Sequence, residues 1–176
     1  LDQPVGAAAI NRTIDETYGT IVREAQESMA GGVSLSCMYI TWETYQCGNV
    51  LSLIVSCGWG FDMNTHSVYL YDTATGEQMT TAQLLETLQV EPETFLAAVR
   101  QAAAERFDGK YAGIGGDTDE LVAERRAWTL SDENINLDVM TYADAAGNLY
   151  VYLPIGSIAG AASYEEPLTL DLGAAG

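Results

Sequence analysis

The sequence predicts an α+β fold, in which a long N-terminal helix and central helices pack on a mainly antiparallel sheet. Apolar residues recur every three or four positions over residues 7–29, the period of a helix with one apolar face. Alternating runs rich in β-branched and aromatic residues stand on both sides of the central helical region and favour strands. Helices and strands come in blocks, which favours antiparallel pairing over parallel βαβ units.

In the first half of the chain, we expect the helix over 7–29 to end at Gly31-Gly32. Strands over 33–47 and 50–57 should form an antiparallel hairpin about the turn Gly48-Asn49. A third strand over 65–71 leads into a tight turn from Asp72 to Gly76, in which aspartate bonds the backbone and glycine takes a positive φ.

The second half should begin with two helices, a short one over 82–88 capped by Thr80 or Thr81, and a longer one from Pro92 to about Phe107. After a loop and a helical turn over 120–126, alternation and turn residues predict these strands: 127–130, 134–142, 149–154 and 167–172. Residues 1–176 are expected to form a single domain, with 1–6 as an extended lead-in and 173–176 as a loosely ordered tail.

The composition is strongly acidic, with 25 Asp and Glu against 7 Lys and Arg and a net charge of -18. Such a surface repels phosphate backbones and anionic headgroups, so nucleic acid is excluded as a partner, and cationic or neutral partners are favoured. The alternative is that the acidity serves only solubility. No apolar run reaches the length of roughly 20 residues that a spanning helix needs. The chain begins at Leu1 without methionine, so we expect a processed or excised piece, attached to a membrane only through an anchor outside this sequence.

The three cysteines are Cys37, Cys47 and Cys57, an odd number without a C-x-x-C pair, which predicts no zinc site. The two-residue hairpin turn places Cys57 opposite Ile40 and Cys37 opposite Gly60. No two cysteines are then directly opposed. Three free thiols and one disulfide that needs a bulge or a shifted register both stay open.

A catalytic triad that needs histidine could use only His66, the one histidine of the chain. His66 is expected within a strand, so its neighbour Ser67 should point to the opposite face. We expect a surface or half-buried sheet histidine, and we predict no catalytic residue, no metal ligand and no cofactor. Carboxylates are too numerous to single out an acid–base pair.

The order of these elements from Ile10 to Leu172 resembles the PdaC/RsiV-like superfamily of bacterial extracytoplasmic domains. The helix carries an I-N-x-x-I pattern at residues 10–14, and the tight turn at residues 72–76 matches the D-x-x-T-G motif of that superfamily. Where many members read G-G-A-H, residues 58–61 read Gly-Trp-Gly-Phe, so the histidine of the superfamily is absent. Relatives occur in anti-sigma factors that sense lysozyme and beside polysaccharide deacetylase domains. The resemblance implies an extracytoplasmic place in the cell envelope, as a lipoprotein or membrane-anchored protein, and binding of a protein or glycan.

The candidate ligand-binding residues gather around the loop after the second strand and on the neighbouring strands: Trp59, Phe61, Asp62, Asn64, Trp42 and Tyr69. The aromatic residues among them, with Tyr39, Tyr45 and Tyr71, could form one exposed surface on a sheet face, suited to sugars or a basic protein. The alternative is that they pack beneath the helices.

The sequence therefore favours a non-enzymatic recognition or sensing domain of a bacterial envelope protein, with a lysozyme-like cationic protein or a cell-wall glycan as ligand. Two other hypotheses remain: a carboxylate-dependent hydrolase of envelope polysaccharide, and a structural spacer domain.

Overall fold

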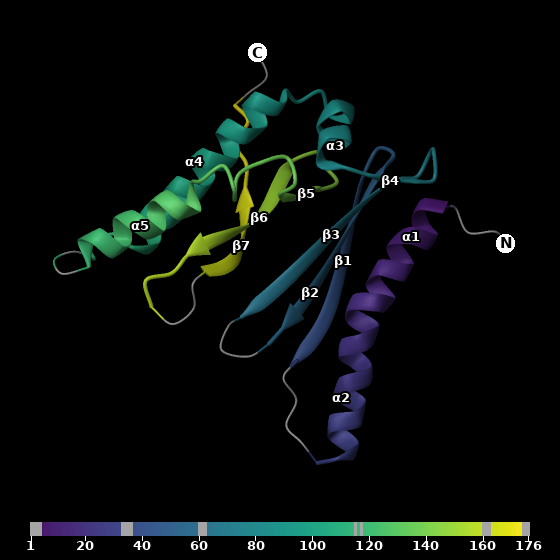
Figure 1. Cartoon of the computed structure of the whole chain (residues 1–176). Helices are drawn as coiled ribbons and strands as arrows, with labels where there is room; N and C mark the ends of the chain where they lie inside the picture. Colours follow the sequence, from purple (N-terminus) through teal and green to yellow (C-terminus); the bar gives the residue numbers. More distant parts are fainter. Residues whose placement is uncertain are drawn as a thin grey trace. The chain divides into compact units, whose positions relative to one another are not determined.

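The computed structural model describes residues 5–32, 37–59, 63–114, 116, 118–159 and 163–173. It confirms the α+β class, because helices pack against two antiparallel sheets (Figure 1). The chain divides into two compact units, Leu1–Met79 and Thr80–Gly176, called here the N-terminal unit and the C-terminal unit. The single domain expected from the sequence stays a prediction.

The N-terminal unit consists of one long helix and a four-stranded sheet of order β1-β2-β3-β4. Its elements are α1 (Val5–Ile14), the π-helical segment η1 (Asp15–Gly19), α2 (Thr20–Ala30), β1 (Tyr39–Cys47), β2 (Val50–Gly58), β3 (Asn64–Asp72) and β4 (Glu77–Met79). The predicted long helix is confirmed, but it begins at Val5, so that Val5 and Gly6 are helical rather than part of an extended lead-in. The strand expected over 33–47 begins at Tyr39, so the prediction is wrong for Cys37 and Met38, which precede the strand. Its residues 33–36 lie outside the described chain.

The β1–β2 hairpin has the predicted register, with Cys47 opposite Val50 and Cys57 opposite Ile40. Gly48 takes a φ of 56° in the connecting turn, a backbone conformation that glycine adopts without the cost a Cβ imposes. Because opposite residues of an antiparallel pair share a face, this register decides which side chains of β1 lie toward the helix. Gly60, the expected partner of Cys37, lies outside the described residues.

The helix covers one face of this sheet, and the buried cluster between them includes Ile10, Tyr18, Val55, Cys57 and Tyr69. Tyr18 donates its hydroxyl hydrogen to the Oγ of Ser67 on β3 (2.8 Å), which satisfies a polar group in this apolar layer. The apolar positions of the helix thus form the buried face that the sequence predicts.

The C-terminal unit has three helices and a three-stranded antiparallel sheet of order β5-β6-β7. Its elements are α3 (Thr81–Thr87), α4 (Pro92–Lys110), α5 (Asp119–Thr129), β5 (Met140–Ala143), β6 (Leu149–Gly156) and β7 (Ser163–Thr169). The expected cap is confirmed, because Thr80 and Gln83 form a capping box at the start of α3. Helices α4 and α5 lie side by side against the sheet (Figure 1), and the fully buried side chains of Phe95, Phe107, Leu149 and Ile155 lie in this core.

Two predicted strands of this unit are wrong. Residues 127–129 are the last turn of α5 rather than a strand, and most of 134–142 is a chain of turns that becomes β5 only at Met140. The Nδ2 of Asn136 donates to the carbonyl of Glu133 (2.9 Å), and the Oδ1 of Asn136 accepts from the backbone N–H of Asp138 (2.8 Å). These local bonds replace the strand ladder that the alternating apolar residues suggested.

Other boundaries differ in smaller ways. The last strand starts at Ser163 rather than 167, β6 continues to Gly156, and the short strand β4 was not predicted. No helix in the described ranges is both long enough and apolar enough to cross a bilayer.

Candidate functional site

The first strand, β1, is an edge of the N-terminal sheet, and it exposes large apolar side chains. Met38, just before the strand, is 67% exposed, Tyr39 48% and Trp42 71%. These three residues are called here the edge patch. The register places Trp42 on the helix side and Tyr39 on the opposite face, so the patch spans both sides of the edge.

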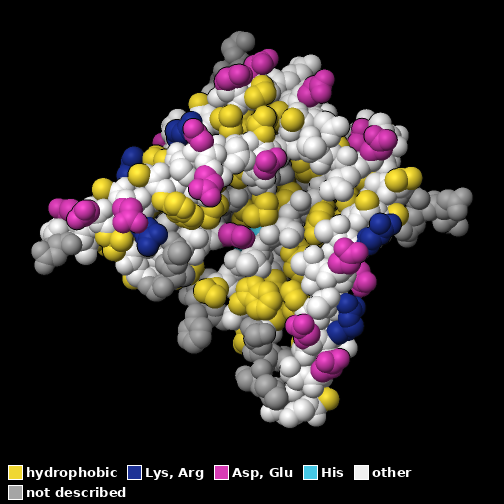
Figure 2. Space-filling model, in the orientation of Figure 1, with side chains coloured by type: hydrophobic (Ala, Val, Ile, Leu, Met, Phe, Trp, Pro, Cys, Tyr) yellow, Lys and Arg dark blue, Asp and Glu magenta, His cyan; other side chains and the backbone are white. Residues whose placement is uncertain are grey.

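The edge patch belongs to a region of very low charge on a very acidic protein. The 27 residues of β1, β2 and β3 include two charged side chains, Glu43 and Asp72. Figure 2 shows hydrophobic side chains gathered on the strands beside the long helix, whose outer side carries charged side chains. An exposed apolar surface with few charges is typical of a binding surface.

Tyr39 is held in place by contacts on the face opposite the helix. Its ring covers Gly58 on β2, where a Cβ would lie 2.4 Å from a ring carbon, and its hydroxyl donates to the Oδ1 of Asn64 (2.9 Å). The predicted site residue Asn64 therefore contacts the edge patch by its hydrogen bond with Tyr39.

Trp59 closes the end of the β2–β3 pair instead of projecting freely. Its Nε1 donates to the Oγ1 of Thr65 (2.9 Å), its backbone N–H donates to the carbonyl of Met63 (2.8 Å), and its ring packs against the buried cluster. Phe61 and Asp62, the other candidates in this loop, lie outside the described residues.

Tyr69 is buried on the helix side of the sheet, which corrects its expected place on an exposed surface. It lines a shallow apolar groove of about 180 Å³ between α1 and the sheet, together with Ala7, Ile10, Asn11, Leu51, Leu53 and Tyr71. The register places Trp42, Tyr69 and Tyr71 on the helix side, but Tyr39 and Tyr45 on the other face. The expected aromatic surface on a single face is therefore wrong, because the aromatic residues of β1 alternate between faces.

His66 is half-buried on β3, as the sequence predicted, and lies directly opposite Ser56 on β2. The Ser56 Oγ and the His66 Nδ1 are 2.9 Å apart, and burial lowers the pKa of His66. The imidazole is therefore neutral near pH 7 and bonded to a hydroxyl across the strands. The sequence analysis compared His66 only with its neighbour Ser67 and so missed its contact with Ser56. The pairing of β2 with β3 is the signal that could have identified this contact.

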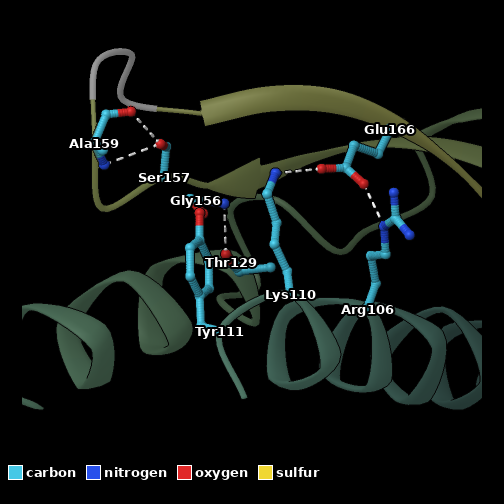
Figure 3. A network of polar contacts seen from close by, with 8 residues as sticks. All are labelled: Arg106, Lys110, Tyr111, Thr129, Gly156, Ser157, Ala159 and Glu166. Atoms are coloured by element: carbon cyan, nitrogen blue, oxygen red, sulfur yellow. Dashed lines mark hydrogen bonds and ion pairs between the residues drawn. The ribbon is translucent and has the colours of Figure 1, made fainter. Parts of the chain in front are cut away.

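The C-terminal unit holds a buried carboxylate that the sequence did not single out. Glu166 on β7 accepts hydrogen bonds from Lys110 (2.6 Å) and Arg106 of α4 (Figure 3). Burial acts to raise the pKa of Glu166, but the hydrogen bonds and charges of the two cations outweigh it, so the net shift is downward. Glu166 thus stays ionised and is not a proton donor near neutral pH.

A second group of polar contacts ties α5 and the end of α4 to β6 (Figure 3). The Thr129 hydroxyl accepts from the backbone N–H of Gly156 (2.9 Å) and donates to the carbonyl of Arg125 (2.9 Å), while the Tyr111 hydroxyl donates to the carbonyl of Gly156 (3.1 Å). A Cβ at Gly156 would lie 2.9 Å from the Arg125 carbonyl oxygen, so no side chain fits there. These contacts join helix to strand and define no open site.

A cluster of three or more His, Cys, Asp or Glu side chains able to hold a metal ion is absent from the part of the chain that the structure describes. The chain matches no protein-family model, and no curated protein matches it. The resemblance to the PdaC/RsiV-like superfamily therefore stays a prediction.

Proposed function

We propose that this protein is a non-enzymatic recognition module that binds a basic partner protein along strand β1. The observation that carries the proposal is the edge patch, three exposed apolar side chains on and beside a nine-residue edge strand. Its extracytoplasmic place in a bacterial envelope rests on the superfamily resemblance and on no contact in the structure.

Strand β1 lacks the features that ordinarily protect a sheet edge. Edge strands usually carry lysine, proline, several charges or a bulge, which prevent another chain from pairing with them. Glu43 is the one charged residue of β1, the strand has no proline, and its pairing with β2 runs without a break from Tyr39 to Cys47. An extended segment of a partner can therefore add to this edge, with the edge patch contacting its side chains.

The charge of the protein indicates the chemistry of the partner. A net charge of -18 attracts basic proteins over long distances and repels acidic ones. The uncharged strands then provide the short-range contact, because charges are depleted at the centres of interfaces. A glycan would gain from Trp42 but not from the open backbone edge or from the overall charge.

The hydrolase hypothesis lacks a supporting observation. Among the described residues, the carboxylates whose pKa departs from the ordinary range are Asp108, Asp144 and Glu166, and each is lowered. A general acid in polysaccharide hydrolysis needs a raised pKa. The structural-spacer hypothesis does not explain why a long edge strand exposes Trp42.

The proposal is tested by binding to immobilised lysozyme, used as a basic protein probe, and by co-sedimentation with purified peptidoglycan. We expect the protein to bind lysozyme more tightly than an unrelated acidic domain does, and Trp42→Ala to weaken binding at least 10-fold, since exposed aromatic anchors carry most of the energy of an interface. Met29→Ala is the matched control, because Met29 is a 65% exposed apolar residue on α2 and does not belong to β1 or to the edge patch.

Equal losses for the two variants, or no preference over the acidic control domain, would contradict the proposal. Binding to peptidoglycan alone, lost in Trp42→Ala, would assign the surface to a glycan and overturn the protein partner.

A further inference from the structure

Two of the three cysteines meet in the core of the N-terminal unit. The Sγ atoms of Cys37 and Cys57 are 3.2 Å apart, Cys57 is fully buried, and Cys37 is 8% exposed. Both belong to the buried cluster beneath the helix. Cys47 is half-buried at the far end of β1.

The two sulfur atoms come into contact because Cys37 lies before the regular part of β1. A regular continuation of β1 would put Cys37 on the same face as Tyr39, away from Cys57, which is opposite Ile40. The regular strand starts only at Tyr39, and the Sγ of Cys37 turns to the helix side, 3.5 Å from the carbonyl oxygen of Tyr39. The backbone N–H of Met38 donates to the carbonyl of Gly58 (2.7 Å), and Gly58 is also the partner of Tyr39, so two residues face one at the start of β1. This is the arrangement of a β-bulge, one of the two conditions that the sequence left open for a bonded pair.

We propose that Cys37 and Cys57 are a disulfide-forming pair, which is oxidised by thiol–disulfide exchange with a small-molecule disulfide or a disulfide-bearing oxidoreductase. The present separation is about 1.2 Å longer than an S–S bond of about 2.05 Å, a gap that side-chain rotation can close. The proposal does not depend on the partner protein proposed above.

The reaction conserves atoms and electrons. The Cys37 thiolate attacks one sulfur of the external disulfide R–S–S–R, which forms a mixed disulfide and releases the first RS⁻. Cys57 then attacks the Cys37 sulfur and releases the second RS⁻. The two cysteine protons go to the two released thiolates, so the protein loses two electrons and two protons to R–S–S–R, which becomes two R–SH.

The burial of the two sulfurs orders these steps. Cys37 is the partly accessible one and reacts first. Burial, with a smaller effect from the contact with Cys37, raises the pKa of Cys57 to about 12, so Cys57 is a poor first nucleophile. Once the bond has formed, a reducing thiol reaches it only when the hairpin opens, which makes the disulfide resistant in the folded protein.

The bond would lock Cys37, two residues before β1, onto β2 and hold the start of the edge strand. Such a link persists in oxidising compartments and is rare in reducing ones. The third cysteine, Cys47, stays a thiol in either state and serves as an internal reference.

The test is a thiol count on the whole chain, refolded from urea in a glutathione redox buffer and then acid-quenched and denatured. We expect one free thiol at oxidising ratios and three after full reduction, with a mass difference of about 2 Da. Chymotrypsin, which cleaves after aromatic residues and leucine, separates the three cysteines, so the linked peptides should contain Cys37 and Cys57. Cys47→Ser should leave no free thiol when oxidised, and Cys37→Ala should leave two.

A second measurement needs no variant. Oxidation should raise the thermal midpoint of the wild-type protein by roughly 5–10 °C, since a bond that closes a loop of about 20 residues restricts the unfolded chain. Three free thiols in the oxidised wild-type protein, or a linked peptide that contains Cys47, would overturn the assignment.

Discussion

At the scale of single residues, Glu166 combines deep burial with a lasting charge. The cations of Lys110 and Arg106 hold the pKa of its carboxyl below the ordinary value of 4.5 in the folded state. A carboxylate with a lowered folded-state pKa stabilises the fold above its unfolded-state pKa, and that contribution is lost as the pH falls through the folded-state value.

We therefore expect Glu166→Gln to lower the free energy of unfolding by about 1.5–3 kcal/mol at neutral pH, the range for a hydrogen bond to a charged group. The difference from the wild-type protein should begin to shrink as the pH falls below about 4.3, the unfolded-state pKa of glutamate. It should vanish once the pH has fallen through the lowered folded-state pKa, where protonated glutamate resembles glutamine. Urea unfolding at a series of pH values measures this. Glu105→Gln is the control, because Glu105 is exposed and its carboxylate accepts from Gln101, one turn away. A difference that persists at low pH would show that the charge is not its source.

At the scale of elements, two glycines of the long helix differ in what surrounds them. A Cβ at Gly6 would lie 2.5 Å from the backbone nitrogen of Gln78 on β4, and the Gly6 N–H donates to the carbonyl of Gly76 (3.1 Å). A Cβ at Gly19 would meet the carboxylate tip of Asp15 (2.6 Å), an exposed side chain that can move aside. Gly6, and not Gly19, is therefore the glycine that allows the close approach of the helix to the sheet.

The two alanine substitutions should differ in their effects on the free energy of unfolding. Gly6→Ala should lower the free energy of unfolding by roughly 2 kcal/mol or more, because rigid backbone must shift to admit the methyl group. Gly19→Ala should leave it unchanged or raise it by up to about 1 kcal/mol, because alanine favours helix over glycine. Urea unfolding followed by circular dichroism compares them, and equal effects would refute the close contact between α1 and β4.

Local patterns explain which elements could be predicted from the sequence. The long helix and the β1–β2 hairpin follow from periodicity and from Gly48-Asn49, which act within a few residues. The stretch 134–139 alternates like a strand, but asparagine side chains bond the nearby backbone and hold it in turns. Residues 127–129 stay helical because Thr129 bonds Gly156, a contact between residues distant in sequence.

The candidate site shows the same limit. The sequence identified Trp42 as a surface residue, but the burial of Tyr69 depends on where the helix lies over the sheet. The contact of Cys37 with Cys57 depends on where β1 begins. If the regular strand extended back to Cys37, the alternation of side chains would place Cys37 on the opposite face of the sheet from Cys57.

At the scale of the whole molecule, the excess of carboxylates opposes folding through mutual repulsion. Five of the seven basic side chains already form ion pairs with carboxylates: Arg23, Arg100, Arg106, Lys110 and Arg126. The remaining carboxylates have few cations left to pair with, so the balance of surface electrostatics is repulsive. Salt screens this repulsion within a Debye length of about 10 Å at 0.1 M.

We therefore expect the thermal midpoint to rise by roughly 2–5 °C when sodium chloride increases from about 20 mM to 0.5 M. A double variant, Glu24→Gln with Glu27→Gln on the exposed side of α2, should show a smaller rise because it carries two fewer negative charges. Scanning calorimetry of both proteins across the salt series measures the difference. A midpoint that falls with salt would mean that the five ion pairs contribute more to stability than the repulsion removes, contrary to the small energies of exposed pairs.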